Sequence, residues 1–173
     1  LAHLETVHKT EIDLGLTRVG EMKTRLQTAG LLKLNYPIIT VGGTNGKGST
    51  CAYLEQILMA AGYKVGCHTS PHVLDFTERA RFNGEDSTEA QLLPFFHEVE
   101  RVRVQAPEIS LTYFEFTLLV FMCWFDTQQP DAVVLEVGLG GRLDATNVFD
   151  ATAAVVTSVD IDHMGFLGDT REA

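Results

Sequence analysis

Apolar residues along this chain fall into short continuous runs that alternate with longer, periodic segments. The continuous runs are typical of strands buried on both faces of a parallel sheet, and they span residues 36–41, 64–69, 132–137 and 153–158. In the longer segments apolar residues recur three or four positions apart, which predicts helices over residues 17–29, 49–61, 88–105 and 112–126. Strands that alternate with helices favour an α/β fold with a mainly parallel sheet flanked by helices.

Capping residues mark where several of these helices begin. Thr17 is expected to cap the first helix. Thr88 with Gln91, and Thr112 with Glu115, have the spacing of capping boxes, in which side chain and backbone satisfy each other at the first turn. These pairs predict where the third and fourth helices start.

The first two helices end at glycines and carry one apolar face each. Gly30 and Gly62 follow the last periodic residues and suit the left-handed position after a helix. A short extended piece at 79–82 and a turn at Asn83-Gly84 lie between the second strand and the third helix. We expect the two faces to bury Val19, Met22 and Leu26 in the first helix and Leu54, Ile57, Leu58 and Ala61 in the second.

Composition and charge fit a globular domain rather than a nucleic-acid or membrane protein. The 173 residues are 45% hydrophobic and 21% charged, which suits one domain with a sizeable core. The formal net charge of -10 argues against general binding of nucleic acid. The longest apolar stretch, residues 111–125, is too short to span a membrane and contains polar residues. We therefore expect a buried core helix there, no membrane association and a monomer.

The cysteines and the start of the chain predict a cytoplasmic protein. Cys51, Cys67 and Cys123 form no CxxC pair and lie within apolar patterns, so we expect reduced core residues rather than metal ligands or nucleophiles. The first residues show no secretory signal pattern.

A glycine-rich turn carrying one lysine follows the first strand. Such a turn lets backbone N–H groups crowd an anion, while the lysine and the start of the next helix add positive charge. An ordinary P-loop has its first glycine where Val41 stands and a Ser or Thr where Gly48 stands. The loop is therefore interpreted as a variant phosphate cradle for a nucleotide, formed by Gly43, Thr44, Asn45, Gly46, Lys47, Gly48 and Ser49.

With Gly48 in the usual hydroxyl position, a ligand for Mg²⁺ must come from another strand end. Ser70 follows the second strand, Glu136 ends the third like a Walker-B acid, and His163 follows the fourth. In parallel sheets these ends meet at one edge, where ligands bind. Ser70 could instead be a simple turn residue, although the ligand role is favoured, whereas His163 is equally compatible with an ordinary loop residue.

Other polar residues at these strand ends could have purely structural roles. Asp160 and Asp162 are interpreted as shaping a turn rather than binding metal. Arg142 could contact an anion or pair with Asp144, and the sequence favours neither.

Several motifs occur together in an order and at spacings that are typical of a known family. The resemblance extends over the chain from about Asp13 onward. The motifs are Gly43-Thr44-Asn45-Gly46-Lys47-Gly48-Ser49, Thr69-Ser70-Pro71-His72, Leu111-Thr112-Tyr113-Phe114-Glu115, Leu135-Glu136-Val137-Gly138-Leu139-Gly140-Gly141-Arg142-Leu143-Asp144-Ala145-Thr146-Asn147 and Asp162-His163. By these motifs the chain closely resembles folylpolyglutamate synthases, in particular the bacterial bifunctional dihydrofolate synthase/folylpolyglutamate synthases, which are related to the Mur ligases.

The resemblance implies an ATP-dependent ligase that makes an acyl phosphate, which the amine of L-glutamate then attacks. Lys47, Glu136 and His163 would be catalytic, and Ser70, Glu136 and His163 would hold magnesium. Dihydropteroate or tetrahydrofolate would be the acceptor. The pterin would lie against Asp13, Leu14, Gly15 and Leu16, against Thr112, Tyr113, Phe114 and Glu115, and against Leu143, Asp144 and Ala145.

The resemblance also implies parts that this sequence does not contain. A carbamylated lysine would fall beyond Ala173, and a C-terminal glutamate-ligase domain would follow. We thus expect residues 1–173 to be an incomplete N-terminal ATP-binding domain of the central, P-loop-containing Mur-ligase type, without full activity alone. The alternatives are a Mur-type ligase acting on a UDP-sugar peptide and a non-catalytic P-loop module.

Overall fold

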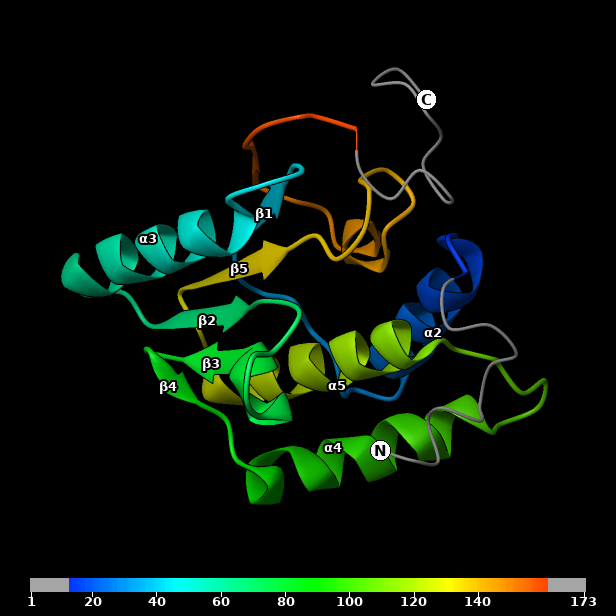
Figure 1. The fold of residues 1–173 in the computed structure, drawn as a ribbon. Helices are drawn as coiled ribbons and strands as arrows, with labels where there is room; N and C mark the ends of the chain where they lie inside the picture. The colour runs from blue at the N-terminus through cyan, green and yellow to red at the C-terminus, as the bar shows by residue number, and fades with distance from the viewer. Residues whose placement is uncertain (1–12, 162–173) are drawn as a thin grey trace.

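The computed structural model describes residues 13–161 as one twisted sheet with helices on both faces (Figure 1). The strand order is β4-β3-β2-β5-β1-β6. Strands β2, β5, β1 and β6 run parallel, with β6 at one edge, whereas β3 and β4 join antiparallel on the other side of β2. The predicted mainly parallel α/β sheet is confirmed. The strands are β1 (Ile38–Gly42), β2 (Val65–His68), β3 (Ala80–Phe82), β4 (Glu85–Asp86), β5 (Ala132–Glu136) and β6 (Ala153–Val156).

The helices divide unequally between the two faces. One face carries α3, and the other carries α5, which is covered in turn by α4 and α2 (Figure 1). Two short 3₁₀ turns, η1 (Phe76–Arg79) and η2 (Ala145–Val148), lie in the loops after β2 and β5. The helices are α2 (Thr17–Thr28), α3 (Lys47–Ala60), α4 (Glu89–Arg103) and α5 (Tyr113–Gln128).

Helix α5 forms the centre of the larger core. Its residues from Glu115 to Phe125 are all buried, because it packs between the sheet and α4. This confirms the buried core helix predicted for the longest apolar stretch. Within residues 13–161 there is no helix with the length and apolar character needed to cross a membrane. Cys51, Cys67 and Cys123 are free and buried, as predicted.

Both predicted capping boxes are present, but the first helix starts differently. The hydroxyls of Thr88 and Thr112 accept hydrogen bonds from the N–H groups of Gln91 and Glu115. The prediction for Thr17 was wrong, because Thr17 is the first helical residue and no side-chain hydrogen bond caps α2 at the residue before it. The face predicted for α2 is confirmed: Val19, Met22 and Leu26 are buried.

The face predicted for α3 was wrong in part. Ile57 is 63% exposed and Ala61 is exposed, whereas Cys51 and Glu55 are buried and Leu58 packs against the smaller core. The reason is a buried ion pair: Glu55 faces the sheet because Arg81 of β3 neutralises it there, with a shortest N–O distance of 3.1 Å. The helix is therefore rotated so that a carboxylate, rather than an isoleucine, lies inside.

Candidate functional site

The parallel register brings four strand ends to one edge of the sheet. Val41 pairs with Glu136, Gly42 pairs with Val156, and His68 pairs with Leu135. The glycine loop, the loop after β2, the segment after β5 and the segment after β6 therefore leave the sheet on the same side. The predicted convergence at this edge is confirmed.

The glycine loop leads directly into the start of α3. Gly46 immediately precedes the helix, in the left-handed conformation with φ of 82°, and has no side chain that could occupy the first-turn N–H groups. These groups, at the positive end of a 14-residue helix, suit an anion. The Lys47 ammonium lies over the loop and donates to the carbonyls of Gly43 at 2.8 Å and Thr44 at 3.2 Å. The predicted cradle residues 43–49 thus form one continuous turn that leads into α3, with backbone N–H groups and the Lys47 ammonium that could hold an anion.

The segment after β6 braces this loop. The Thr44 N–H donates to the Ser158 carbonyl at 2.6 Å, and the Asp160 N–H donates to the Thr44 hydroxyl at 2.9 Å. Asp160 also accepts the Ile161 N–H through its carboxylate, which agrees with its predicted turn-shaping role. Sequence reasoning missed Ser158 as part of the site, although its place at the end of a predicted strand next to the loop was a usable signal.

Gly43 fits this brace only because it lacks a side chain. Its φ is 131°, a conformation that L residues rarely adopt. A Cβ atom there would lie 2.1 Å from the Thr157 hydroxyl oxygen and 3.0 Å from the Ser158 carbonyl oxygen. The close approach of the loop to the segment after β6 therefore depends on Gly43.

Glu136 lies buried where the glycine loop and the loop after β2 meet. Its Oε2 accepts the Ser70 N–H at 3.0 Å. A Cβ atom at Gly48 would lie 3.6 Å from Oε1, so a hydroxyl-bearing residue there would bring its oxygen close to this carboxylate. Burial raises the pKa of Glu136 from its usual value, although the Ser70 N–H and the Lys47 and Arg81 charges oppose the shift. Gly48 thus leaves room beside a buried acid.

The structure brings together two of the three predicted metal ligands. Ser70 and Glu136 are in contact, whereas His163 lies outside the described residues. Residues 13–161 hold no group of three His, Cys, Asp or Glu side chains with metal-binding geometry. A buried carboxylate beside a serine loop and a glycine gap does fit Mg²⁺, which prefers oxygen ligands and keeps several waters.

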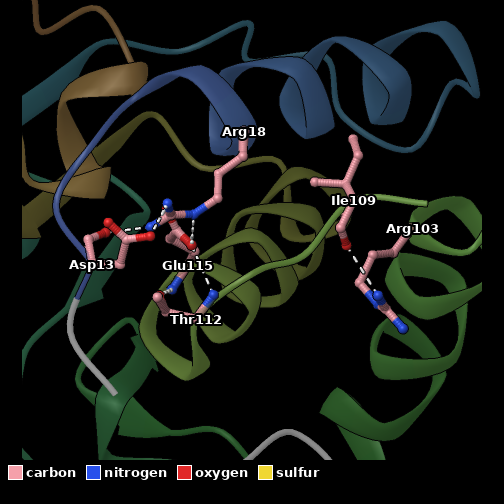
Figure 2. Close-up of polar contacts among 6 residues, drawn as sticks. All are labelled: Asp13, Arg18, Arg103, Ile109, Thr112 and Glu115. Carbon is pink, nitrogen blue, oxygen red and sulfur yellow. Dashed lines mark hydrogen bonds and ion pairs between the residues drawn. The ribbon is translucent and has the colours of Figure 1, made fainter. Parts of the chain in front are cut away.

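A second polar cluster joins the N-terminal segment to the start of α5 (Figure 2). Arg18 donates to Glu115 at 2.9 Å and to the Asp13 carboxylate at 2.5 Å. The Thr112 N–H donates to the same Glu115 carboxylate at 2.7 Å. Leu14, Gly15 and Leu16 lie half-buried between Asp13 and Arg18. The structure therefore brings two predicted acceptor segments together through Arg18, which sequence reasoning missed although it lies in the first turn of a predicted helix.

The loop that leads into α5 is fixed independently of this cluster. Arg103, at the end of α4, donates to the Ile109 carbonyl at 2.9 Å (Figure 2). Arg103 also forms ion pairs with Glu100 and Glu108, both at 2.7 Å. The position of Thr112 is thus fixed both by its own bond to Glu115 and by the bond from Arg103 to Ile109, three residues earlier.

The third predicted acceptor segment follows Glu136 along the chain. A Cβ atom at Gly138 would lie 2.9 Å from the Phe114 ring, so this ring packs directly on the backbone. The buried Asp144 accepts the N–H groups of Gly138 at 3.1 Å and Leu139 at 2.9 Å. Burial raises the pKa of Asp144, against the hydrogen bonds that it accepts. Asp144 therefore folds this loop back onto the start of α5.

The remaining residues of this loop are placed as follows. Ala145 is buried, whereas Leu143 is 45% exposed. Arg142 is exposed, and no ion pair joins it to Asp144 in the described part of the chain, so the predicted pairing alternative does not hold. Tyr113 faces the loop after β2, with the Arg79 guanidinium 5.7 Å from the centre of its ring.

Sequence reasoning also missed His68, which lies buried at the end of β2. Its Nδ1 is 2.7 Å from the Arg79 carbonyl oxygen, and its ring centre is 5.9 Å from that of Phe114. Burial lowers the pKa of His68 to about 4, so the ring is neutral at pH 7. His68 therefore supports Phe114 as a neutral group.

This pKa predicts a loss of stability in mild acid. The unfolded chain binds a proton at His68 below about pH 6.5, whereas the folded chain does so only near pH 4, so stability is lost as the pH falls between these values. From pH 7 to pH 5 we expect a loss of about 2 kcal/mol from this residue. Urea denaturation of the full-length protein at both pH values measures it. His68→Asn should remove this part of the slope and His97→Asn, on the exposed face of α4, should retain it; equal slopes in all three proteins would contradict the assignment.

The fold and the glycine loop together define an α/β domain of the P-loop type, with Gly48 where an ordinary P-loop has Ser or Thr. Residues 41–173 match the family of the Mur ligase middle domain. Because the match covers most of the chain, the chain belongs to this family.

Individual relatives narrow the similarity further. The chain is 51% identical over 173 residues to the dihydrofolate synthase/folylpolyglutamate synthase of Escherichia coli, covering 100% of this chain and 40% of that protein. The solved structure of E. coli FolC in complex with DHPP and ADP superposes with a TM-score of 0.92 at 51% identity, over 99% of this chain and 40% of that one. The solved structure of the bifunctional folylpolyglutamate synthase/dihydrofolate synthase of Yersinia pestis, complexed with AMPPNP and Mn, superposes with a TM-score of 0.88 at 48% identity, over 99% of this chain and 40% of that one. The chain thus spans about two fifths of the length of these relatives.

Proposed function

We propose that the full-length protein is an ATP-dependent ligase that adds L-glutamate to dihydropteroate, giving dihydrofolate, and to folates. One observation carries the proposal. The segment that leaves β5 joins the phosphate side to the acceptor side, because Glu136 contacts the Ser70 loop beside Gly48 while Gly138, two residues on, packs under Phe114. Relatives named for this reaction are 51% and 47% identical to the chain over its 173 residues.

In this proposal the glycine loop binds ATP. The N–H groups of residues 43–49 and the Lys47 ammonium would hold the phosphates, which requires Lys47 to leave the loop carbonyls that it contacts in this structure. Ser70, Glu136 and His163 would hold Mg²⁺, which neutralises charge on the phosphates. The relatives bound to ADP, or to AMPPNP with Mn, support this assignment.

The acceptor would lie beyond Phe114, with its carboxylate directed toward the phosphates. The pterin would contact the segments at 13–16, 112–115 and 143–145. A carboxylate oxygen attacks the γ-phosphorus, the bond to the β-phosphate oxygen breaks, and ADP leaves. The amine of L-glutamate then attacks the acyl carbon, phosphate leaves, and the amide loses its proton to solvent or a base.

The proposal concerns the whole ligase, because the relatives are much longer than this chain. Residues 1–173 would be its N-terminal ATP-binding part, and a later part would complete the glutamate site. We further propose that the full-length protein is a cytoplasmic monomer.

Incorporation of labelled glutamate tests the reaction. The full-length protein is mixed with ATP, Mg²⁺, labelled L-glutamate and either dihydropteroate or tetrahydrofolate. We expect label in a pterin product, and ATP turnover that depends on the acceptor. A folded, ATP-binding protein that labels neither acceptor would overturn the proposal.

The two capping boxes provide a matched test of the acceptor site. Thr112→Ala and Thr88→Ala each remove one box and should each cost about 1 kcal/mol of stability. Only Thr112→Ala should also raise the KM for dihydropteroate, because the Thr112 hydroxyl accepts the Glu115 N–H at 3.2 Å and so fixes the start of the helix that carries the Glu115–Arg18 pair. Steady-state kinetics and urea denaturation of both variants separate the effects. If the two variants have equal KM values, Thr112 is a capping residue alone.

A further inference from the structure

Arg81 connects two parts of the phosphate side that come from distant places in the sequence. It lies on β3, and its side chain is 19% exposed. Its Nη1 donates to the Thr69 hydroxyl at 3.0 Å and to the Glu78 carbonyl at 3.2 Å. Its Nε and Nη2 donate to Glu55 at 3.2 Å and 3.1 Å. One guanidinium thus holds both ends of the loop after β2 and a residue of α3.

The contact with Glu55 joins Arg81 to α3, the helix that begins in the glycine loop. Glu55 lies on α3, about two turns after the helix begins at Lys47. Its side chain is 4% exposed, and within residues 13–161 its Oε1 has no hydrogen-bond partner. Arg81 therefore supplies the only hydrogen bonds that the described residues give to this carboxylate. Any shift of α3 relative to β3 would have to stretch this pair.

The contact with Thr69 joins Arg81 to the loop that carries Ser70, one of the proposed metal ligands. Thr69 directly precedes Ser70, whose N–H donates to Glu136 at 3.0 Å. The Thr69 N–H also donates to the Arg79 carbonyl at 3.3 Å, which closes the base of the loop. The Arg81–Thr69 bond thus fixes the residue next to Ser70.

An arginine suits this position for a geometric reason. Its planar fork presents donors in several fixed directions, whereas a lysine offers one nitrogen on a flexible stem. Only a guanidinium can donate to Glu55 through Nε and Nη2 and, at the same time, to Thr69 and the Glu78 carbonyl through Nη1. A need for charge alone would be met by either residue.

We propose that Arg81 is a positioning residue that fixes the Ser70 loop relative to α3, and thereby sets the affinity of the site for its divalent metal. The inference rests on the proposed metal site of Ser70 and Glu136. Residues that orient metal ligands in this way typically change metal affinity by about 10-fold to 100-fold when they are removed. A purely structural ion pair would instead change stability and leave metal affinity unaltered.

Removal of Arg81 itself would leave Glu55 buried and unpaired, which destabilises a fold. Thr69 offers a cleaner test, because Thr69→Val removes one hydrogen bond and leaves the Arg81–Glu55 pair intact. Thr69→Ser keeps the hydroxyl and is the matched control. Arg81→Lys keeps a charge beside Glu55 but cannot hold Thr69 as well.

Electron paramagnetic resonance measures the affinity of the full-length protein for Mn²⁺ in the presence of AMPPNP. Neither acceptor nor glutamate is added. We expect Thr69→Val and Arg81→Lys to weaken Mn²⁺ binding about 10-fold and Thr69→Ser to stay within about twofold. Melting temperatures of the Thr69 variants should agree. Wild-type affinity in Thr69→Val, or an equal loss in Thr69→Ser, would overturn the inference.

This experiment separates the inference from the proposed reaction. Because no acceptor is present, a failure of the labelled-glutamate assay leaves the Mn²⁺ result unaffected. If the wild-type protein binds no Mn²⁺ with AMPPNP, both the metal site and the inference are refuted.

Discussion

Glu136→Gln in the full-length protein should lower ATP turnover by about 10³-fold or more, with little loss of stability. Loss of the ionised oxygen would weaken the proposed metal site, and a bound metal supplies several kcal/mol of charge stabilisation in the transition state. The fold should tolerate the change, because an amide oxygen can still accept the Ser70 N–H. Burial already disfavours the charged form of Glu136, as its raised pKa indicates, so a neutral isostere costs little.

Acceptor-dependent ATP turnover and urea denaturation measure the two effects separately. Glu98→Gln, on the surface of α4, is the control, and it should retain wild-type turnover because Glu98 pairs only with Arg101 among its described ion pairs. Turnover of Glu136→Gln within tenfold of wild type would remove Glu136 as a metal ligand. A large loss of stability would show that Glu136 has a structural role instead.

Gly43→Ala should separate the glycine loop from the segment after β6 and abolish tight nucleotide binding. The new Cβ would lie 2.1 Å from the Thr157 hydroxyl oxygen and would also require a backbone conformation with φ of 131°. Strain and clash together should cost about 3 kcal/mol. The Thr44 N–H would then lose the Ser158 carbonyl as its partner.

Gly30→Ala provides the matched control for this prediction. Gly30 also has a positive φ, of 73°, but a Cβ there would meet nothing within 4 Å, so only conformational strain of about 1 kcal/mol is added. Binding of a fluorescent ATP analogue and urea denaturation compare the two variants. If Gly43→Ala is no less stable than Gly30→Ala and binds nucleotide as the wild type does, the brace has no role.

The sequence predicts the strands and the buried helix well because their signals are local. The β-branched runs and the Thr112–Glu115 box each depend on residues within one element, and the structure keeps them. The buried face of α3 was mispredicted because Glu55 takes its orientation from Arg81, on another element. A carboxylate at an apolar position looks like an exposed residue until its partner is known.

In the candidate site, too, residues with a local sequence signal could be predicted and residues placed by contacts between elements could not. The glycine loop, Ser70 and Glu136 could be predicted, since each stands at a strand end and parallel strand ends converge. Arg18, His68 and Arg81 could not, because their roles come from contacts such as Arg18 with Glu115, 97 residues apart. Residues that position others carry no local pattern of their own.

The proposed metal site depends on the residue at position 48 of the glycine loop. The absence of a side chain at Gly48 leaves space beside Glu136, and the Ser70 loop contacts the same carboxylate from the other side. We propose that the metal hydroxyl of an ordinary P-loop is supplied here by Ser70, after β2, which is separated from β1 by β5. The acceptor carboxylate would then approach the phosphates from the side of Phe114.

Transfer of an acceptor oxygen to phosphate tests this account most directly. The full-length protein is supplied with ATP, Mg²⁺, L-glutamate and dihydropteroate whose carboxylate carries ¹⁸O, and the released phosphate is analysed by mass spectrometry. Attack of the carboxylate on the γ-phosphorus predicts one ¹⁸O atom in each phosphate released. Amide product accompanied by unlabelled phosphate would contradict the acyl-phosphate reaction.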